Sequence, residues 1–376
     1  MKSLYIHIPF CKEKCAYCDF PSFKLENKND ISDYIDHLII ELSFYRDTGF
    51  ETVYIGGGTP SIIGIHDCKR LFKKVEEVVK PVPWMEYTVE ANPESLSEES
   101  LKIWMDHGVN RISLGVQSFD DKVLAGIKRL TRRRDIQYAA ELLYKRDVQN
   151  FNIDLILGIQ GKGIFKTDLK RAVSLKPAHM SVYLLSISAS TPIKRMIKEN
   201  SINILPDEGY EDLYYYTEDV LADSGYERYE VSNYSKPGFE SRHNLNYWNG
   251  GEYIGVGLSA VSTIGNRRTK NCENIIEYYK IIEEGMKPVS ETEYITPKKR
   301  AYEKIMLSLR TSTGIELREL IRLTAEDKLK NLFEFIDMLN KKGYTCSTVS
   351  GSLVLSKKGL FRSNSVIVEI WRFIKD

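Results

Sequence analysis

The sequence predicts an α/β fold: an incomplete six-unit (β/α) barrel, followed by a small, mostly helical, winged-helix-like C-terminal domain. Two observations lead to this prediction. Short apolar runs alternate with helix-like segments through the first half of the chain, and this alternation ends near Leu185. Such alternation implies parallel strands joined by right-handed crossovers. In a barrel of this kind, the functional residues are expected at the carboxyl ends of the strands.

The expected barrel elements are six short strands and the helices between them. The strands are Leu4–Ile8, Thr52–Ile55, Tyr87–Glu90, Arg111–Leu114, Phe151–Leu155 and Met180–Leu184. The helices are Ser32–Tyr45, Cys68–Val79, Glu98–His107, Arg134–Lys145 and Phe165–Ser174.

The second half of the chain follows a different pattern. A helix over Glu208–Ala222 precedes an aromatic, glycine-rich stretch that runs from Tyr226 to Gly265. The tail is expected to hold helices near Lys298–Arg310, Leu317–Leu323 and Lys328–Lys341, a hairpin over Tyr344–Leu355 and a last helix to Lys375. We therefore divide the chain into a barrel (residues 1–265), a linker (266–295) and a C-terminal helical domain (296–376).

Composition excludes several classes of partner. The chain has 376 residues with 53 basic and 52 acidic side chains, so it has no charge bias toward nucleic acid or a membrane surface. The sequence shows no signal-peptide pattern, and no apolar run approaches the roughly 20 residues that cross a bilayer. These features predict a soluble, cytoplasmic protein with no stable membrane insertion.

Three of the six cysteines crowd together after the first expected strand, as Cys11, Cys15 and Cys18. In a chain of this size, clustered thiols indicate metal binding or catalysis rather than disulfides. The spacing lets one loop bind three irons of a [4Fe–4S] cluster and leaves the fourth iron open. The alternatives are a zinc knuckle or chance, which the missing fourth ligand and the strand context argue against. Cys68, Cys272 and Cys346 are scattered, as is typical of small buried residues.

A glycine-rich run, Gly56-Gly57-Gly58-Thr59-Pro60-Ser61, ends the second expected strand. Glycines there let the backbone approach a ligand and aim its N–H and C=O groups at it. Glycines also simply make turns, so the run alone is a weak signal. Its place beside the cysteine loop favours the ligand-binding interpretation.

Together, these residues resemble the radical SAM superfamily. The shared features are the CxxxCxxC loop, the aromatic Tyr17 before its last cysteine, and GGGTPS after the second strand. The flanking sequences YIHIPFCKEKCAYCDF, TVEANP, GVQSF and NIDLILG resemble the branch that contains oxygen-independent coproporphyrinogen III oxidase and the HemW-type heme chaperones. The resemblance implies that the open iron chelates S-adenosylmethionine (SAM) and that the reduced cluster cleaves SAM to a 5′-deoxyadenosyl radical.

The resemblance also implies particular SAM contacts. Tyr5 and the backbone of Gly57, Gly58 and Thr59 would hold the methionyl end, and Tyr17 would lie beside the adenine. The remaining polar groups of SAM would be bound by Glu90, Gln117, Arg129 and Asp154. Each of these could instead be a buried, hydrogen-bonded residue or a surface charge. For Glu90 and Asp154, ligand contact is favoured, because an unpaired buried carboxylate is costly.

Two features separate the chaperones from the oxidases of this branch. The oxidases carry a further cysteine two residues after the third, and this chain has Phe20 there. The run His243-Asn-Leu-Asn-Tyr-Trp248 matches the HNxxYW pattern of the chaperones. A histidine beside Tyr and Trp offers a ligand for heme iron and an aromatic wall, but it also fits a packed loop with a hydrogen-bonded histidine. The resemblance favours heme.

Several positions depart from the branch. Thr131 replaces the histidine of its LGRxH pattern, Gln160 replaces a usual proline, Ser188 replaces a common glutamate, and residues 257–262 are closer to the oxidase. The leading hypothesis is a heme chaperone that delivers heme to a client protein, with no catalytic residue assigned. The alternative is a radical enzyme that decarboxylates coproporphyrinogen III or opens the heme ring. A structural metal-binding scaffold is the third hypothesis, and the SAM-pocket residues argue against it.

Overall fold

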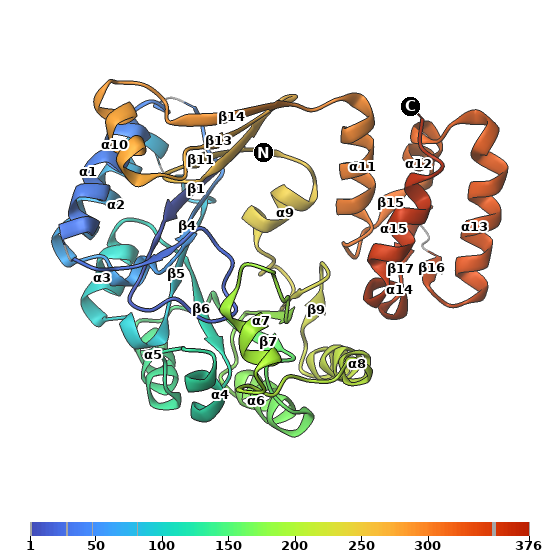
Figure 1. Ribbon diagram of the computed structural model, residues 1–376, viewed down its shortest axis with the longest axis horizontal. Coiled ribbons are helices and arrows are strands. Elements are labelled where there is room, and N and C mark those ends of the chain that lie inside the picture. The colour runs from blue at the N-terminus through green and yellow to red at the C-terminus, as the bar shows by residue number, and fades with distance from the viewer. Residues whose placement is uncertain (1, 28, 47, 81, 348–350, 376) are drawn as a thin grey trace.

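One twelve-stranded sheet forms the body of the protein in the computed structural model (Figure 1), which describes residues 2–27, 29–46, 48–80, 82–347 and 351–375. The strand order is β14-β13-β12-β11-β1-β4-β5-β6-β7-β8-β10-β9. The sheet ends at the free edges of β14 and β9, so it is curved but not closed. This confirms the incomplete barrel.

All six predicted barrel strands are present, adjacent and parallel. They are β1 (Lys2–Ile8), β4 (Thr52–Gly57), β5 (Glu86–Ala91), β6 (Arg111–Gln117), β7 (Phe151–Leu157) and β8 (His179–Leu184). Their side chains are buried on both faces, as is usual when helices cover one face of a parallel sheet and the barrel interior lies on the other.

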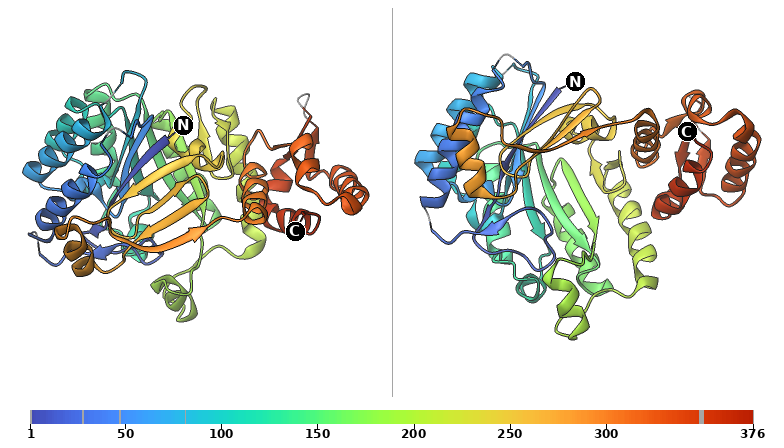
Figure 2. Two further views of the ribbon diagram at one scale, coloured as in Figure 1. Left: turned by 90° about the horizontal axis from the view of Figure 1, so that it is seen from above. Right: turned by 45° about the horizontal axis from the view of Figure 1, so that its top comes forward.

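Helices cover the outer face of these strands (Figure 2). The predicted helices are present as α1 (Asn29–Ser43), α2 (Ile65–Val79), α3 (Glu98–Asp106), α5 (Arg133–Lys145) and α6 (Lys162–Ser174), together with the short α4 (Asp121–Gly126). On α2, the buried residues Cys68, Leu71, Phe72 and Val75 recur at the helical period and face the sheet. Ser97 begins α3 with a capping box, and the Asp120 side chain caps α4.

The segment predicted as a linker, residues 266–295, instead extends the sheet. It holds β13 (Arg267–Asn271), α10 (Ile275–Glu283) and β14 (Val289–Tyr294), and the two strands pair antiparallel beyond β12 (Val261–Ile264). The strand β11 (Glu252–Val256) joins β12 to the parallel edge at β1. The sequences of these two strands, RRTKN and VSETEY, carry few apolar residues, because an antiparallel strand with solvated side chains needs none.

The other edge of the sheet carries the remaining barrel elements. They are α7 (Pro192–Lys198), α8 (Asp207–Asp223), β9 (Glu227–Arg228), β10 (Asn233–Ser235) and α9 (Arg242–Trp248). The helix predicted near Glu208–Ala222 is confirmed as α8. The HNxxYW residues form a short helix, α9, whose N-cap Ser241 accepts a hydrogen bond from the Asn244 N–H.

The C-terminal residues pack around a second hydrophobic cluster beside the sheet (Figure 1). The predicted helices are present as α11 (Pro297–Ser308), α12 (Leu317–Leu323), α13 (Leu329–Lys341) and α15 (Ser363–Trp371), with the short α14 (Lys357–Phe361). The predicted hairpin is present as β16 (Thr345–Ser347) and β17 (Ser352–Leu355), which pair with β15 (Ile315–Glu316); residues 348–350 lie outside the described residues. The division into domains stays a prediction. Among the described residues, every helix is too short or too polar to cross a membrane.

Candidate cofactor site

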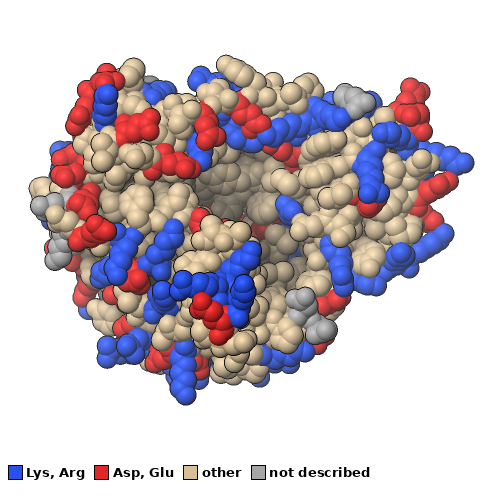
Figure 3. Space-filling view, in the orientation of Figure 1, with Lys and Arg blue, Asp and Glu red and all other residues tan. Residues whose placement is uncertain are grey.

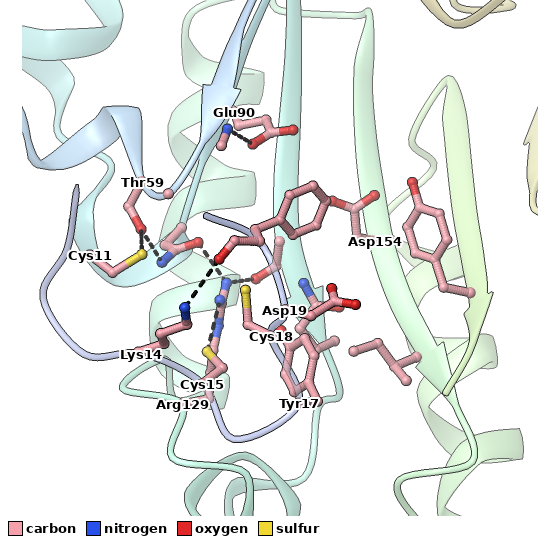
Figure 4. A pocket seen from close by; sticks show the side chains of 18 of the residues that line it. Cys11, Lys14, Cys15, Tyr17, Cys18, Asp19, Thr59, Glu90, Arg129 and Asp154 are labelled. Carbon is pink, nitrogen blue, oxygen red and sulfur yellow. Dashed lines mark hydrogen bonds between the residues drawn. The ribbon is translucent and has the colours of Figure 1, made fainter. Parts of the chain in front are cut away.

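The cysteine loop lies between two short strands, β2 (Phe10–Cys11) and β3 (Phe23–Lys24), which pair with each other. The Lys14 ammonium fastens the loop internally, because it donates to the carbonyl oxygens of Phe20 at 3.1 Å and Ser22 at 2.8 Å. The Ala16 N–H donates to the Ile127 carbonyl at 2.9 Å, which ties the loop to the segment after α4. The three cysteines therefore lie together at the carboxyl ends of the barrel strands (Figure 4).

The thiols have polar partners of their own. Thr59 Oγ1 lies 3.5 Å from Cys11 Sγ, and Arg129 Nη1 lies 3.6 Å from Cys15 Sγ. Burial raises the pKa of Cys11 and of Cys18. Within the described residues, no three His, Cys, Asp or Glu side chains are close enough to hold a single metal ion. Three thiolates are one ligand short of a structural zinc site, and they match a cluster that keeps one iron open.

Most of the predicted site residues line one cavity of about 390 Å³, which begins at the cysteine loop. The structure brings together there Cys11, Cys15, Tyr17, Cys18, Gly57, Gly58, Thr59, Glu90, Gln117, Arg129 and Asp154. We call this space the cofactor cavity. Tyr5 and His243 do not line it.

The backbone of the glycine loop is hydrogen-bonded to the residues that lead into the cysteine loop. The Gly58 N–H donates to the Ile8 carbonyl at 2.6 Å, and the Thr59 N–H donates to the Phe10 carbonyl at 2.8 Å. A Cβ on Gly58 would lie 2.5 Å from the Phe10 oxygen. Gly57 has a φ of +109°, which favours glycine. The glycines therefore allow close packing of β4 against the start of the cysteine loop, and the contact of this backbone with a ligand stays a prediction.

Glu90 and Asp154 both face the cofactor cavity, from β5 and β7 (Figure 4). Glu90 accepts hydrogen bonds from the Tyr54 hydroxyl at 2.6 Å and the Gly57 N–H at 3.1 Å. Asp154 accepts from Asn152 Nδ2 at 2.7 Å. Burial raises the pKa of Asp154 and raises that of Glu90 to about 7. The carboxyl of Glu90 can therefore donate or accept a hydrogen bond near neutral pH.

Arg129 is held by residues to which the sequence analysis assigned no ligand contact. Its Nη2 donates to Asn92 Oδ1 at 2.7 Å and to the Gly115 carbonyl, and its Nε donates to Thr131 Oγ1 at 3.2 Å. Thr131, which replaces the histidine of the branch, thus still serves as a partner of the arginine. Asn92 also donates to Thr59 Oγ1 at 3.2 Å and lines the cofactor cavity. Its signals in the sequence are its place in the TVEANP segment and its position two residues after Glu90, on the same side of the strand end.

Gln117 ends β6 in a left-handed backbone conformation, with a φ of +68°. The pairing with β7 shifts register between Gly115 and Gln117. Positive φ is uncommon for residues other than glycine and often accompanies ligand-binding sites. This turn lets Gln117 line the cofactor cavity at the point where the strand ends.

Tyr5 and His243 line a second cavity of about 370 Å³, which we call the aromatic cavity. It shares Phe20, Gly57 and Glu90 with the cofactor cavity. Its walls carry four tyrosines, Tyr5, Tyr54, Tyr247 and Tyr253. The Tyr5 hydroxyl lies 2.9 Å from His7 Nδ1, so it already has a partner within the protein. The contact of Tyr5 with the methionyl end of SAM stays a prediction.

His243 is buried, and both of its ring nitrogens have partners. Nδ1 lies 2.9 Å from Thr52 Oγ1, and Nε2 lies 3.3 Å from the Tyr247 hydroxyl. Its backbone N–H donates to Glu86 Oε1 at 2.8 Å. Burial lowers the pKa of His243 to about 3, so the imidazole is neutral at pH 7. These contacts are those expected of a packed loop with a hydrogen-bonded histidine. The His243 ring also borders the aromatic cavity.

Comparison with known proteins agrees with this arrangement. The family model of the Radical SAM superfamily matches residues 5–164, from β1 to the start of α6. The fold and the cysteine loop therefore define a radical SAM protein. Heme chaperone HemW of Lactococcus lactis is 35% identical over 334 residues, covering 88% of this chain and 86% of that protein. Heme chaperone HemW of Bacillus subtilis is 34% identical over 322 residues, covering 84% and 85%. The chain belongs to the HemW family of the radical SAM superfamily.

A solved structure shares the whole fold. Coproporphyrinogen III oxidase (HemN) from Escherichia coli superposes with a TM-score of 0.82, covering 99% of this chain and 89% of that chain. The two sequences are 22% identical, so this likeness bears on the fold. Family membership implies a [4Fe–4S] cluster and SAM as cofactors.

Proposed function

We propose that this chain is a heme chaperone, which binds heme beside a [4Fe–4S] cluster and SAM and transfers the heme to a client protein. The observation that carries the proposal is the aromatic cavity, where α9 sets His243 and Tyr247 next to the cofactor cavity. A neutral imidazole among aromatic walls is suited to heme. The relatives named heme chaperone HemW support this choice.

In this proposal, Cys11, Cys15 and Cys18 each bind one iron and leave the fourth open. The Gly57-Gly58-Thr59 segment lies against the methionyl end of SAM, and Tyr17 lies beside the adenine. The remaining polar contacts come from Glu90, Gln117, Arg129 and Asp154. When bound, the cluster and SAM supply one-electron chemistry. The chain's own part is to position both ligands and to hold Glu90 in a site where its carboxyl can take up a proton near neutral pH.

His243 would bind heme iron through Nε2. Its contact with the Tyr247 hydroxyl, at 3.3 Å, is longer than the 2.9 Å contact between Nδ1 and Thr52. Rotation of the Tyr247 side chain would therefore free Nε2, while Thr52 keeps the ring oriented through Nδ1. The partners we propose are heme or a related porphyrin and a heme-accepting client protein, in the cytoplasm, where cysteine thiols stay reduced.

Heme titration of the anaerobically reconstituted protein tests this function. We expect stable heme binding and no conversion of coproporphyrinogen III to protoporphyrinogen with SAM and reductant. His243→Ala should weaken heme affinity about tenfold or more, or shift the Soret band, with the Fe–S absorbance unchanged. His66→Ala, on the exposed side of α2, is the matched control.

Two results would contradict the proposal in different ways. Turnover of coproporphyrinogen, or opening of the heme ring, would show a radical enzyme that acts on porphyrins. Heme binding with an unchanged spectrum in His243→Ala would reduce the HNxxYW segment to a packing role.

A further inference from the structure

Phe20 is an aromatic side chain that borders both cavities. It follows the cysteine loop and is 58% exposed. Single exposed apolar residues are common on protein surfaces. Phe20 differs from such residues because, with Gly57 and Glu90, it lines both the cofactor cavity and the aromatic cavity.

The backbone that carries Phe20 is held in place on both sides. Its carbonyl accepts hydrogen bonds from the Lys14 ammonium at 3.1 Å and the Ser22 N–H at 2.7 Å. The next carbonyl, that of Pro21, lies 2.9 Å from His7 Nε2, which reaches it from β1. Because the backbone is already fixed, only the side-chain torsions of Phe20 are ordered when a ligand packs against its ring.

Apolar and aromatic side chains stand among the polar and charged residues that line the two cavities. Tyr183 and Leu184, at the end of β8, line the cofactor cavity and are 42% and 41% exposed. In the aromatic cavity, the rings of Tyr247 and Tyr253 lie 4.5 Å apart and those of His243 and Tyr247 lie 5.1 Å apart. The face drawn in Figure 3 is hollowed near its centre; most of the surface inside the hollow is uncharged, and charged side chains stand at its rim. Exposed apolar groups gathered at a cavity indicate an apolar ligand.

We propose that the ring of Phe20 packs against the plane of a porphyrin and makes this side chain a specificity-determining contact of the heme site. The inference rests on the proposed function and adds a contact to the macrocycle itself, independent of iron. A flat, largely apolar ring system is the ligand that an exposed phenyl ring and several tyrosines accommodate best. Tyr17 lines the cofactor cavity alone, so it is the better neighbour for the smaller adenine of SAM.

Titration of the full-length, reconstituted protein with heme and with iron-free protoporphyrin IX tests this contact. Phe20→Ala should weaken both affinities about tenfold, with unchanged SAM affinity and Fe–S absorbance. Phe20→Trp should restore porphyrin binding. His243→Ala should weaken heme binding alone, because iron-free porphyrin has no metal to ligate. Phe333→Ala is the matched control, since Phe333 is 47% exposed on α13 and lines neither cavity.

Each other outcome has its own meaning. Wild-type binding of both porphyrins in Phe20→Ala would overturn the Phe20 contact and leave the heme function standing. Loss of SAM affinity together with porphyrin affinity would assign the ring to SAM instead and overturn the inference. If Phe20→Ala loses the cluster, Phe20→Leu keeps apolar bulk without the ring, and wild-type porphyrin affinity in that variant would overturn the inference as well. If the wild-type protein binds neither porphyrin, both proposals fail.

Discussion

Single residues in this site do two tasks at once. Thr59 donates from Oγ1 toward Cys11 Sγ and, through its N–H, fastens the glycine loop to Phe10. Arg129 reaches Cys15 Sγ while Asn92 and Thr131 hold its other nitrogens. Burial opposes the charge of Arg129, but the neighbouring Tyr17 and Cys15 raise its pKa overall, so it stays cationic. A cation in this position partly balances the negative charge that a thiolate-bound cluster would bring to the loop.

At this scale, we expect each cysteine of the loop to be necessary for the cluster. Cys11→Ala, Cys15→Ala or Cys18→Ala should abolish the broad visible absorbance of thiolate–iron bonds after anaerobic reconstitution, because each removes one of three protein ligands. Cys68→Ala and Cys272→Ala are the controls, since both thiols are buried away from the cofactor cavity. An equal loss of absorbance in either control would refute the three-ligand assignment.

The elements are joined by buried polar contacts as well as by apolar packing. Glu41 of α1 accepts hydrogen bonds from the Gly257 N–H at 2.8 Å, Asn271 Nδ2 at 2.8 Å and the Tyr278 hydroxyl at 2.6 Å. These partners belong to the turn after β11, to β13 and to α10. One carboxyl therefore connects the first helix to the segment that was expected to be a linker.

This contact gives stability a definite pH dependence. Burial raises the pKa of Glu41 from its ordinary 4.5 to about 7, so in this range the folded chain keeps a proton that the unfolded chain has lost. The free energy of unfolding should therefore fall as pH rises through this window, on the order of 3 kcal/mol from this group, and level off above it.

Urea unfolding at pH 5 and pH 8 measures this effect. Glu41→Gln cannot titrate, so the stability advantage of the wild type over this variant should be larger at pH 5 than at pH 8. Glu284→Gln, at the exposed end of α10, should follow the wild type at both pH values. A larger advantage at pH 8 would mean that the carboxylate, not the acid, is the form that the fold favours.

On the scale of the whole molecule, the cofactor cavity gathers side chains from β4, β5, β6, β7 and β8 around the cysteine loop. Polar contacts to one ligand thus depend on the sheet holding all of these strand ends at a common edge.

We expect SAM binding to depend on the cluster. The open iron and the Gly57-Gly58-Thr59 segment would contact the same methionyl group, so loss of the iron removes the stronger of the two contacts. SAM affinity, measured by equilibrium dialysis, should fall at least about tenfold in cluster-free protein. Circular dichroism of the same samples checks that the fold is kept. Equal affinity with and without the cluster would place the SAM pocket elsewhere.

The sequence by itself determined the six parallel strands, their helices and the residues at their carboxyl ends. This was possible because buried parallel strands appear as short apolar runs, and because parallel strands bring their ends to one edge. From that rule, Glu90 and Asp154 were expected together although 64 residues separate them along the chain, and they line one cavity. Strand β13 escaped prediction because its solvated face leaves no apolar signal.

Only the tertiary structure decided which cavity each residue borders and which of its atoms are already paired. It placed Tyr5 and His243 in the aromatic cavity, gave both nitrogens of His243 protein partners, and showed that Asn92 and Thr131 hold Arg129. It also turned the N–H groups of Gly58 and Thr59 toward the cysteine loop. The physical reason is that hydrogen bonds form between groups brought together by folding, and residue spacing along the chain carries no record of those distances.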